Sequence, residues 1–300
     1  MSVFGSVEAG GTKFVCGLGA GPADIETMQF PTASPDETVE KAIAFFQERG
    51  GGLRSIGIGS FGPIDPRPNS PTFGHITSTP KLEWRNYDLA GALRDQLGVP
   101  VAFDTDVNAA VLAESRWGAG AGLEDFLYVT VGTGVGGGAM VHGRVLHGLL
   151  HPEMGHIPVP HDSLNDPFAG CCPYHGDCLE GLASGPAMEA RWGIPPSALP
   201  VDHPAWALEA NYLALALAAW VCTLSPRRVL LGGGVMQQSH LFPLIRAELA
   251  RILNGYIQAS ELLSGLDRFV TRPQLGSRAG VLGGLILAEE ILEAQPSSRS

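Results

Sequence analysis

The sequence predicts an α/β protein of two related lobes, and three observations lead to that prediction. Strand-like and helix-like segments alternate along most of the chain. A glycine-rich turn that contains Gly and Thr follows the first strand of each half, at Gly10–Thr12 and at Gly132–Gly134. A Gly/Ala linker at 118–122 separates the halves. We therefore expect lobes at 1–117 and 118–300 that face each other, with both turns in one cleft.

In the first half, residues 3–7 and 14–18 have the pattern of a β-hairpin around the first turn. Residues 34–37, Ser-Pro-Asp-Glu, are typical of a capping box with proline at the first helical position. Residues 64–80 are rich in Pro, Ser and Thr and predict a surface loop or lid. The remaining elements expected here are a helix ending at 50–52, strands at 55–59 and 99–103, and helices at 89–97 and 107–117.

In the second half, residues 126–131 form a clear strand pattern, followed by a glycine-rich turn at 132–138. The apolar stretch at 212–224 carries no charge but is short for a membrane span, so it predicts a buried helix. The last helix could pack back on the first lobe. The other expected elements are a hairpin around 142–143, helices at 204–224, 239–254 and 278–293, and strands at 228–231 and 268–271.

The composition favours a folded, acidic protein. Apolar residues make up 45% of the 300 residues and charged residues 16%, and the net charge is −11. Such a surface repels nucleic acids and anionic membranes, so neither is expected as a partner. The N-terminus lacks the basic and apolar regions of a signal peptide, and we expect a cytoplasmic protein.

The two Gly-Thr turns suit phosphate binding. Backbone N–H groups and a hydroxyl can point at phosphate oxygens, and a missing Cβ allows close approach. Residues 132–137 also match the dinucleotide pattern G-x-G-x-x-G, which requires a following helix. A strand is expected after them instead, so we reject that reading, and no Walker A lysine motif is present. Ordinary hairpin turns remain the alternative for either turn taken alone.

A carboxylate at a strand end is the candidate general base. Transfer of a phosphoryl group to a sugar needs a group that accepts the hydroxyl proton. Asp106 lies where strand 99–103 ends, but it could equally be the N-cap of the following helix. Asp104 is a competitor, since an alternating strand end places both side chains on the same side.

Cysteine and histidine cluster in one short segment. Cys172, His175 and Cys178 lie at equal three-residue steps, and His156 lies upstream. These four ligands suit tetrahedral Zn²⁺ in a structural site within the loop 151–181. Cys171 or His161 could replace one of them. The odd total of five cysteines argues against a disulfide framework.

These motifs together resemble the ROK sugar kinases, in particular their bacterial fructokinase branch. The resemblance covers nearly the whole chain. The matching segments are 8–13 (first phosphate loop), 59–63 (sugar loop), 105–110 (base segment), 132–136 (second phosphate loop), 151–156 (Glu-x-Gly-His), 172–178 (zinc loop), 179–186 (second sugar Glu and nucleotide pocket) and 232–235 (adenosine turn).

The resemblance implies an actin/hexokinase-like (ribonuclease H-like) two-lobed fold with ATP and sugar in the interdomain cleft, and a homodimer. It implies ATP, Mg²⁺ and Zn²⁺ as cofactors, and it selects Asp106 over Asp104 as the base. The implied sugar contacts are Gly62, Pro63, Thr105, Glu153, His156 and Glu180. The implied nucleotide contacts are Gly10, Gly11, Thr12, Lys13, Gly132, Thr133, Gly134, Pro186, Gly233 and Gly234.

Two departures from the family pattern bear on specificity. Glu8 stands where many members have Asp, a carboxylate expected near magnesium. Thr105 stands where many glucokinases of the family have Asn, which removes an amide contact to the sugar and agrees with the fructokinase branch.

The expected reaction is the ATP-dependent phosphorylation of D-fructose to fructose 6-phosphate. A broader hexose kinase acting on mannose or glucose is the alternative enzyme. A sugar-responsive regulator is the non-enzymatic alternative, although the first phosphate loop begins at residue 8 and leaves no room for an N-terminal DNA-binding domain.

Overall fold

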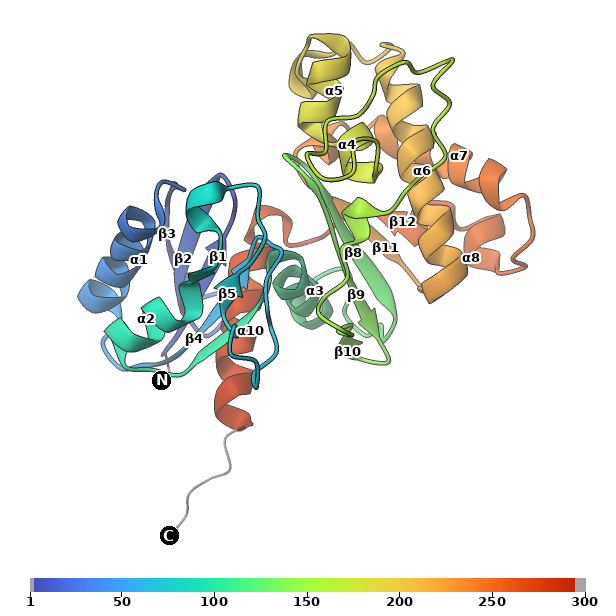
Figure 1. The fold of residues 1–300 in the computed structure, drawn as a ribbon. Helices are drawn as coiled ribbons and strands as arrows, with labels where there is room; N and C mark the ends of the chain where they lie inside the picture. Colours follow the sequence, from blue (N-terminus) through green and yellow to red (C-terminus); the bar gives the residue numbers. More distant parts are fainter. Residues whose placement is uncertain (1–2, 295–300) are drawn as a thin grey trace. The chain divides into compact units, whose positions relative to one another are not determined.

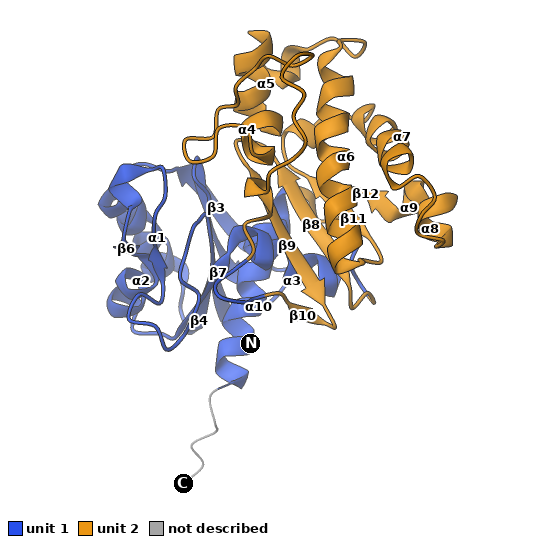
Figure 2. Ribbon diagram, turned by 45° about the vertical axis from the view of Figure 1, so that its right-hand side comes forward, with its two compact units in different colours: residues 1–121, 147–151, 277–300 blue, residues 122–146, 152–276 orange. Residues whose placement is uncertain are grey.

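The computed structural model describes residues 3–294, and Figure 1 shows their path. The chain divides into two compact units (Figure 2). Of the described residues, unit 1 contains 3–121, 147–151 and 277–294, and unit 2 contains 122–146 and 152–276. The division near 121 lies close to the linker expected from the sequence. The segment 147–151, however, belongs to unit 1 and not to the lobe at 118–300. Residues 277–294, which contain the last helix, also belong to unit 1, in line with the expectation that this helix could pack back on the first lobe.

Unit 1 is built on a five-stranded sheet of order β3-β2-β1-β4-β7. β1 pairs antiparallel with β2 and parallel with β4, and β4 pairs parallel with β7. The carboxyl ends of β1, β4 and β7 therefore meet at one edge. The strand bounds are β1 Val3–Ala9, β2 Lys13–Gly19, β3 Glu26–Pro31, β4 Leu53–Ser60 and β7 Val101–Thr105, with a separate pair β5 His75–Ile76 and β6 Tyr87–Asp88.

Unit 2 repeats this arrangement. Its sheet has the order β10-β9-β8-β11-β12, again with a hairpin followed by parallel strands. The structure therefore confirms that the two halves are related. The bounds are β8 Phe126–Val131, β9 Val135–Val141, β10 Arg144–Val145, β11 Val229–Gly232 and β12 Val270–Thr271.

The helices cover the faces of these sheets (Figure 1). In unit 1 they are α1 Pro35–Arg49, α2 Leu89–Leu97, α3 Asp106–Trp117, α10 Ala279–Glu293 and the short 3₁₀ turn η1 Leu82–Trp84. In unit 2 they are α4 Leu179–Ala183, α5 Gly185–Trp192, α6 Ala205–Leu224, α7 Leu241–Leu253, α8 Ser260–Leu263 and α9 Leu266–Phe269, with 3₁₀ turns η2 Met154–His156, η3 Pro196–Ala198 and η4 Val235–Gln237. The 3₁₀ turn η5 Gly276–Arg278 begins with the last residue of unit 2 and continues into unit 1.

The last helix, α10, completes the core of unit 1. It packs directly on β4, where a Cβ on Gly57 would lie 2.0 Å from the Gly284 carbonyl oxygen. The Ser6 and Ser55 hydroxyls donate hydrogen bonds to carbonyls of this helix at 2.6 and 2.5 Å. These contacts satisfy the buried hydroxyls and fix how the helix lies on the sheet.

The long apolar helix α6 lies in the core of unit 2. By length and composition it could cross a membrane, and it is the one such helix among residues 3–294. Most of its side chains are buried within the unit, including Trp206, Tyr212 and Trp220. A long and largely apolar helix of this kind is expected where other core elements surround it.

Two local expectations are wrong in detail. Ser34 is the N-cap of α1 but makes no capping hydrogen bond through its side chain; the Thr38 hydroxyl instead accepts the Ala33 N–H at 3.0 Å. The glycine-rich turn ends at Gly134, because β9 already begins at Val135. That strand confirms the rejection of a dinucleotide motif, which needs a helix there.

The predicted loop at 64–80 is held together by one carboxylate. Asp65 is 2% exposed and accepts hydrogen bonds from Arg67, Ser70 and Thr72 at 2.5–2.8 Å. The Arg67 guanidinium and these hydroxyls hold the pKa of Asp65 far below its usual range. The loop is thus internally ordered around a buried anion.

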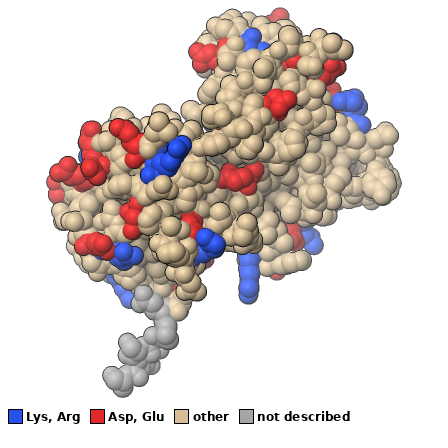
Figure 3. Space-filling model, viewed as in Figure 1, with Lys and Arg blue, Asp and Glu red and all other residues tan. Residues whose placement is uncertain are grey.

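Charged side chains are spread over the surface drawn in Figure 3. On that face of the described residues, Lys and Arg stand singly or next to Asp and Glu, with no extended basic patch.

Candidate active site

In unit 1 the strand register brings three predicted segments to one edge of the sheet. Ala9 pairs with Ser60 across β1 and β4, and Ser60 pairs with Thr105 across β4 and β7. The first Gly-Thr turn, the loop 61–63 and Asp106 each follow one of these residues in the chain. They therefore lie side by side at the carboxyl edge, where parallel sheets bind ligands.

The first turn is a tight hairpin closed by the backbone. The Gly10 N–H donates to the Lys13 carbonyl oxygen at 2.9 Å, and a Cβ on Gly10 would lie 2.7 Å from that oxygen. The Thr32 hydroxyl donates to the Gly10 carbonyl at 2.7 Å. Thr12 is exposed, so its hydroxyl is accessible to a ligand.

The predicted sugar loop is tied to its neighbours on both sides. The Phe61 N–H donates to the Ala9 carbonyl oxygen at 2.8 Å. Beyond the cis Gly62-Pro63 peptide, the Pro63 carbonyl accepts from both the N–H and the hydroxyl of Thr77, at 2.7 and 3.0 Å. Gly62 and Pro63 are half-buried at the sheet edge.

Asp104 and Asp106, which the sequence left as competitors, have different surroundings. The Asp104 carboxylate is 5% exposed and accepts from Thr105 N–H, Asn108 Nδ2 and His147 Nε2 at 2.7–2.9 Å. Asp106 is half-buried, and its Oδ1 accepts the Val107 N–H at 2.8 Å. Asp106 is thus the more accessible carboxylate of the two.

The suggested N-cap role of Asp106 is wrong. The N-cap of α3 is Thr105, whose hydroxyl accepts the Asn108 N–H at 3.1 Å, and Asp106 is the first helical residue. Thr105 is itself 5% exposed. The helix start is therefore satisfied without Asp106.

Glu8, near the end of β1, is half-buried. Burial raises its pKa, while the Lys13 ammonium and a backbone hydrogen bond from Val281 oppose that shift. Its Oε2 is buried and has no hydrogen-bond partner among the described residues. Gly280 of α10 leaves room for it, since a Cβ there would lie 2.6 Å from the Glu8 carboxyl carbon.

In unit 2 the second Gly-Thr turn joins β8 to β9 and contacts two other segments. The Gly132 carbonyl accepts the Gly185 N–H at 2.7 Å at the start of α5, where Pro186 follows. A Cβ on Gly132 would lie 3.7 Å from the Gly234 nitrogen. Unit 2 therefore gathers nearly all of its predicted nucleotide contacts around one turn.

Gly233 shows why glycine is needed beside this turn. Its φ is +94°, and a Cβ there would lie 2.3 Å from the Val131 carbonyl oxygen. Any other residue would be strained in this conformation and would push against the end of β8.

The predicted sugar-binding side chains of unit 2 converge on the same region. Glu180 Oε2 accepts the Val135 N–H at 3.0 Å, just after the turn, and its Oε1 lies 3.9 Å from His156 Nε2. The Glu153 side chain is accessible, yet partial desolvation and the nearby Glu180 carboxylate raise its pKa to about 7. Two acids and a histidine thus offer acceptors and a donor for hydroxyl groups.

The close approach of Gly134 to Glu180 leads to a first prediction. A Cβ on Gly134 would lie 2.6 Å from Glu180 Oε2, so Gly134→Ala should displace that carboxylate from the Val135 N–H. We expect the KM for the sugar to rise about tenfold, the cost of one charge-assisted hydrogen bond. Steady-state kinetics measures it, with Gly51→Ala as control because nothing lies within 4 Å of a Cβ there. An unchanged sugar KM in Gly134→Ala would contradict the role given to Glu180.

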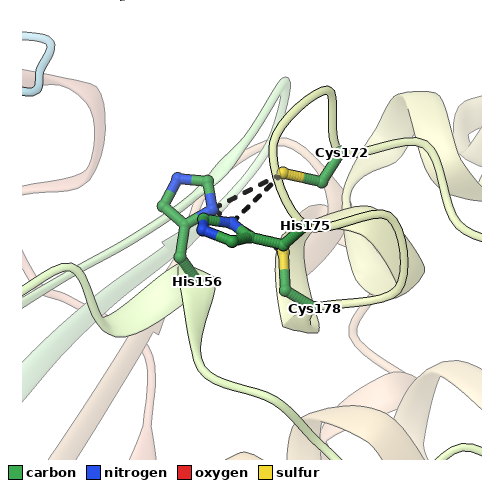
Figure 4. Close-up of side chains that lie close together, drawn as sticks. All are labelled: His156, Cys172, His175 and Cys178. Atoms are coloured by element: carbon green, nitrogen blue, oxygen red, sulfur yellow. Dashed lines mark hydrogen bonds between the residues drawn. The ribbon is translucent and has the colours of Figure 1, made fainter. Parts of the chain in front are cut away.

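The four predicted zinc ligands lie together in unit 2 (Figure 4). The ligand atoms of His156, Cys172, His175 and Cys178 all lie within 4.8 Å of one another. The three sulfur–nitrogen distances are 3.6–3.7 Å. Tetrahedral zinc with normal bond lengths separates its S and N ligands by about 3.5 Å, so the geometry and the donor set fit this metal.

The two alternative ligands lie outside this cluster. Cys171 is exposed and precedes the buried Cys172. His161 contacts Asp177 through Nδ1 at 3.0 Å and the Asp166 carbonyl through Nε2 at 2.9 Å. Among the described His, Cys, Asp and Glu side chains, His156, Cys172, His175 and Cys178 form the group that could hold a metal ion.

With this geometry in place, comparison with known proteins identifies the family. The pattern of the ROK family matches residues 4–291. The chain belongs to the ROK family. A protein of Bacillus subtilis (strain 168) is 48% identical to this chain over 297 residues. The matched region includes 99% of this chain and 98% of the Bacillus protein.

Two further relatives of this ROK chain carry functional names. A fructokinase of Zymomonas mobilis is 42% identical and covers 95% of this chain and 96% of its own. A ROK family glucokinase from Streptomyces griseus, whose crystal structure was solved in complex with glucose and AMPPNP, is 25% identical in sequence. Its structure matches with a TM-score of 0.76, over 96% of this chain and 100% of the glucokinase chain. These likenesses confirm the predicted actin/hexokinase-like α/β fold class.

Sequence reasoning missed one polar cluster of unit 1, formed by Asp104, Asn108 and His147. His147 lies 39 residues beyond Asn108 in the chain, so no local spacing pattern links them. The one available signal was the recurrence of histidine at 147, 151 and 156 around Glu153.

Proposed function

We propose that this chain is a fructokinase that transfers the γ-phosphoryl group of ATP to D-fructose and releases fructose 6-phosphate and ADP. The observation that carries the proposal is the 42% identity, over nearly the full length of both chains, to a protein named fructokinase. The presence of a Gly-Thr turn in each unit and the accessible carboxylate at a parallel-sheet edge support the same chemistry.

Asp106 acts as the general base. Its carboxylate takes the proton from the sugar hydroxyl while the hydroxyl oxygen bonds to the γ-phosphorus and the bond to the β–γ bridging oxygen breaks. The backbone N–H groups and hydroxyls of the two Gly-Thr turns hold the phosphates. The nucleotide contacts are those predicted above, namely Gly10, Gly11, Thr12, Lys13, Gly132, Thr133, Gly134, Pro186, Gly233 and Gly234.

The sugar is oriented by hydrogen bonds between its hydroxyls and side-chain or backbone groups of both units. Glu153, Glu180 and His156 supply these contacts in unit 2, and Gly62, Pro63 and Thr105 supply them in unit 1. Correct orientation of the attacking hydroxyl contributes much of the rate of such a transfer, because phosphoryl transfer depends on in-line geometry.

Two metal ions belong to the proposal. Bound Mg²⁺ would neutralise part of the negative charge of the phosphates. Glu8 fits a nearby cation, since its buried Oε2 has no partner among the described residues. The ligands His156, Cys172, His175 and Cys178 fit Zn²⁺, which stabilises the loop that carries His156.

A steady-state assay with ATP and fructose, mannose or glucose tests the proposal. We expect kcat/KM to be highest for fructose, because Thr105 lacks the amide found in many glucokinases of the family. A higher value for glucose or mannose would identify a broader hexose kinase. No turnover with any of the three would favour a sugar-binding regulator instead.

We also propose a homodimer in the cytoplasm that binds hexose and ATP but neither nucleic acid nor membranes. The net charge of −11 supports the last two points, since it disfavours polyanions. Light scattering on purified protein measures the oligomeric state, and a monomer at micromolar concentration would contradict the dimer.

A further inference from the structure

Residues 147–151 form a short segment that we call the strap. In the chain it lies between β10 and η2, both in unit 2, but its own contacts place it in unit 1. Leu149 is 87% exposed, so burial of this apolar side chain does not hold the strap in place. Two histidines at its ends make side-chain hydrogen bonds to unit 1.

The first histidine contacts the segment that carries the proposed base. His147 Nε2 lies 2.9 Å from Asp104 Oδ2, and it is the donor because a carboxylate only accepts. Asp104 is buried, and its other oxygen accepts from the Thr105 N–H and Asn108 Nδ2. Asp104 thus joins the strap to the first turn of α3, where Asp106 is the first residue.

The second histidine contacts the segment that carries the sugar loop. His151 Nε2 accepts the Ile64 N–H at 3.1 Å. Ile64 is fully buried and directly follows Pro63. The strap therefore touches unit 1 beside the base segment at one end and beside the sugar loop at the other.

We infer that His147 and His151 are positioning residues for phosphoryl transfer, His147 acting through Asp104 on Asp106 and His151 acting through Ile64 on the sugar loop. The inference rests on the proposed function. Each contact is a directed polar bond at a sheet edge, and directed bonds fix positions more narrowly than exposed apolar contacts do. A base displaced by about 1 Å can lose up to about a hundredfold in rate.

A pair of substitutions at each position separates positioning from general packing. Glutamine can place an amide at the site of histidine Nε2, whereas asparagine has the same chemistry but ends one bond earlier. Both replacements are polar and of similar size, so both variants should fold. Melting curves verify this, and His142→Asn is the control because His142 is 89% exposed in its side chain.

For His147 we expect a loss of kcat. His147→Gln keeps the donor to Asp104 and should retain most of the activity, while His147→Asn should lower kcat about tenfold with little change in either KM. Equal kcat values in the two variants, or a loss confined to KM, would overturn the role of His147.

For His151 we expect the effect on the KM for the sugar and not on kcat. His151→Asn removes the acceptor for the Ile64 N–H and should raise the KM for the sugar about tenfold, with kcat and the KM for ATP little changed. His151→Gln should restore the sugar KM. A fall in kcat with unchanged sugar KM, or no rescue by glutamine, would overturn the role of His151.

A double-mutant cycle tests whether His147 acts through Asp106. In an Asp106→Asn background, His147→Asn should have almost no further effect on the residual rate. The carboxylate whose position His147 controls is then already absent. Full additivity would overturn the inference. The two failures are distinguishable: near-normal turnover of Asp106→Asn alone would refute the proposed base, and the Gln/Asn comparison at 147 would still report on positioning.

Discussion

Replacement of Asp106 by asparagine should abolish most of the turnover while the sugar still binds. We expect kcat to fall by about a hundredfold to ten-thousandfold, the range for loss of a general base. The fold should persist, because Asn retains the Oδ1 acceptor for the Val107 N–H and Thr105 remains the N-cap of α3. Steady-state kinetics gives the rate, and calorimetry gives the affinity for fructose.

A matched control is available at another helix start of the same unit. Asp36 lies in the first turn of α1, so Asp36→Asn makes the same chemical change away from the sheet edge. It should leave kcat unchanged. Turnover of Asp106→Asn within about tenfold of the parent enzyme would remove Asp106 from the role of base.

Loss of the zinc ligands is the second change expected to have a large effect. Cys172→Ser or Cys178→Ser should reduce the metal content from about one zinc per chain to near zero, because serine is a poor ligand for this ion. The loop 157–178 should then be cut by chymotrypsin, and the KM for fructose should rise about tenfold or more, because His156 is proposed to contact both zinc and sugar. Elemental analysis, proteolysis and kinetics measure the three effects.

We do not expect unit 2 as a whole to unfold without the metal. Asp166 also holds the loop, since it accepts hydrogen bonds from Tyr212 Oη at 2.6 Å and from Arg191 Nε at 3.0 Å. Metal removal should therefore act locally, as an opening of the loop with a moderate fall in melting temperature.

Cys171→Ser is the control for the zinc prediction. Cys171 directly precedes Cys172 but is exposed and lies outside the ligand group, so its substitution should keep both metal and activity. Metal-free protein that matches the parent in stability, protease resistance and sugar affinity would contradict a structural zinc site.

Much of the candidate site could be predicted because its signals are local. The Gly-Thr turns, the strand before Asp106 and the Cys-x₂-His-x₂-Cys spacing each lie within a few residues, where covalent geometry limits the possible structures. The fold class followed from the repeated alternation of such segments, and the structure confirms it in two sheets of the same strand order.

Other features depend on residues far apart in the chain. Spacing placed Asp104 and Asp106 on the same side of the strand end. The structure shows that the Asp104 carboxylate already accepts hydrogen bonds from Thr105, Asn108 and the distant His147. The cap of α3 belonged to Thr105 because its hydroxyl reaches the Asn108 N–H, a choice that depends on the dihedral angles at the helix start.

The sequence by itself predicted the alternating elements, a Gly-Thr turn in each half, the carboxylate after β7 and the Cys-x₂-His-x₂-Cys segment, since neighbouring residues encode all of them. Tertiary structure alone decided that the strap 147–151 joins unit 1 and that Asp104 is a buried acceptor. These outcomes follow from packing and hydrogen bonding between distant segments, whose partners no short stretch of sequence specifies.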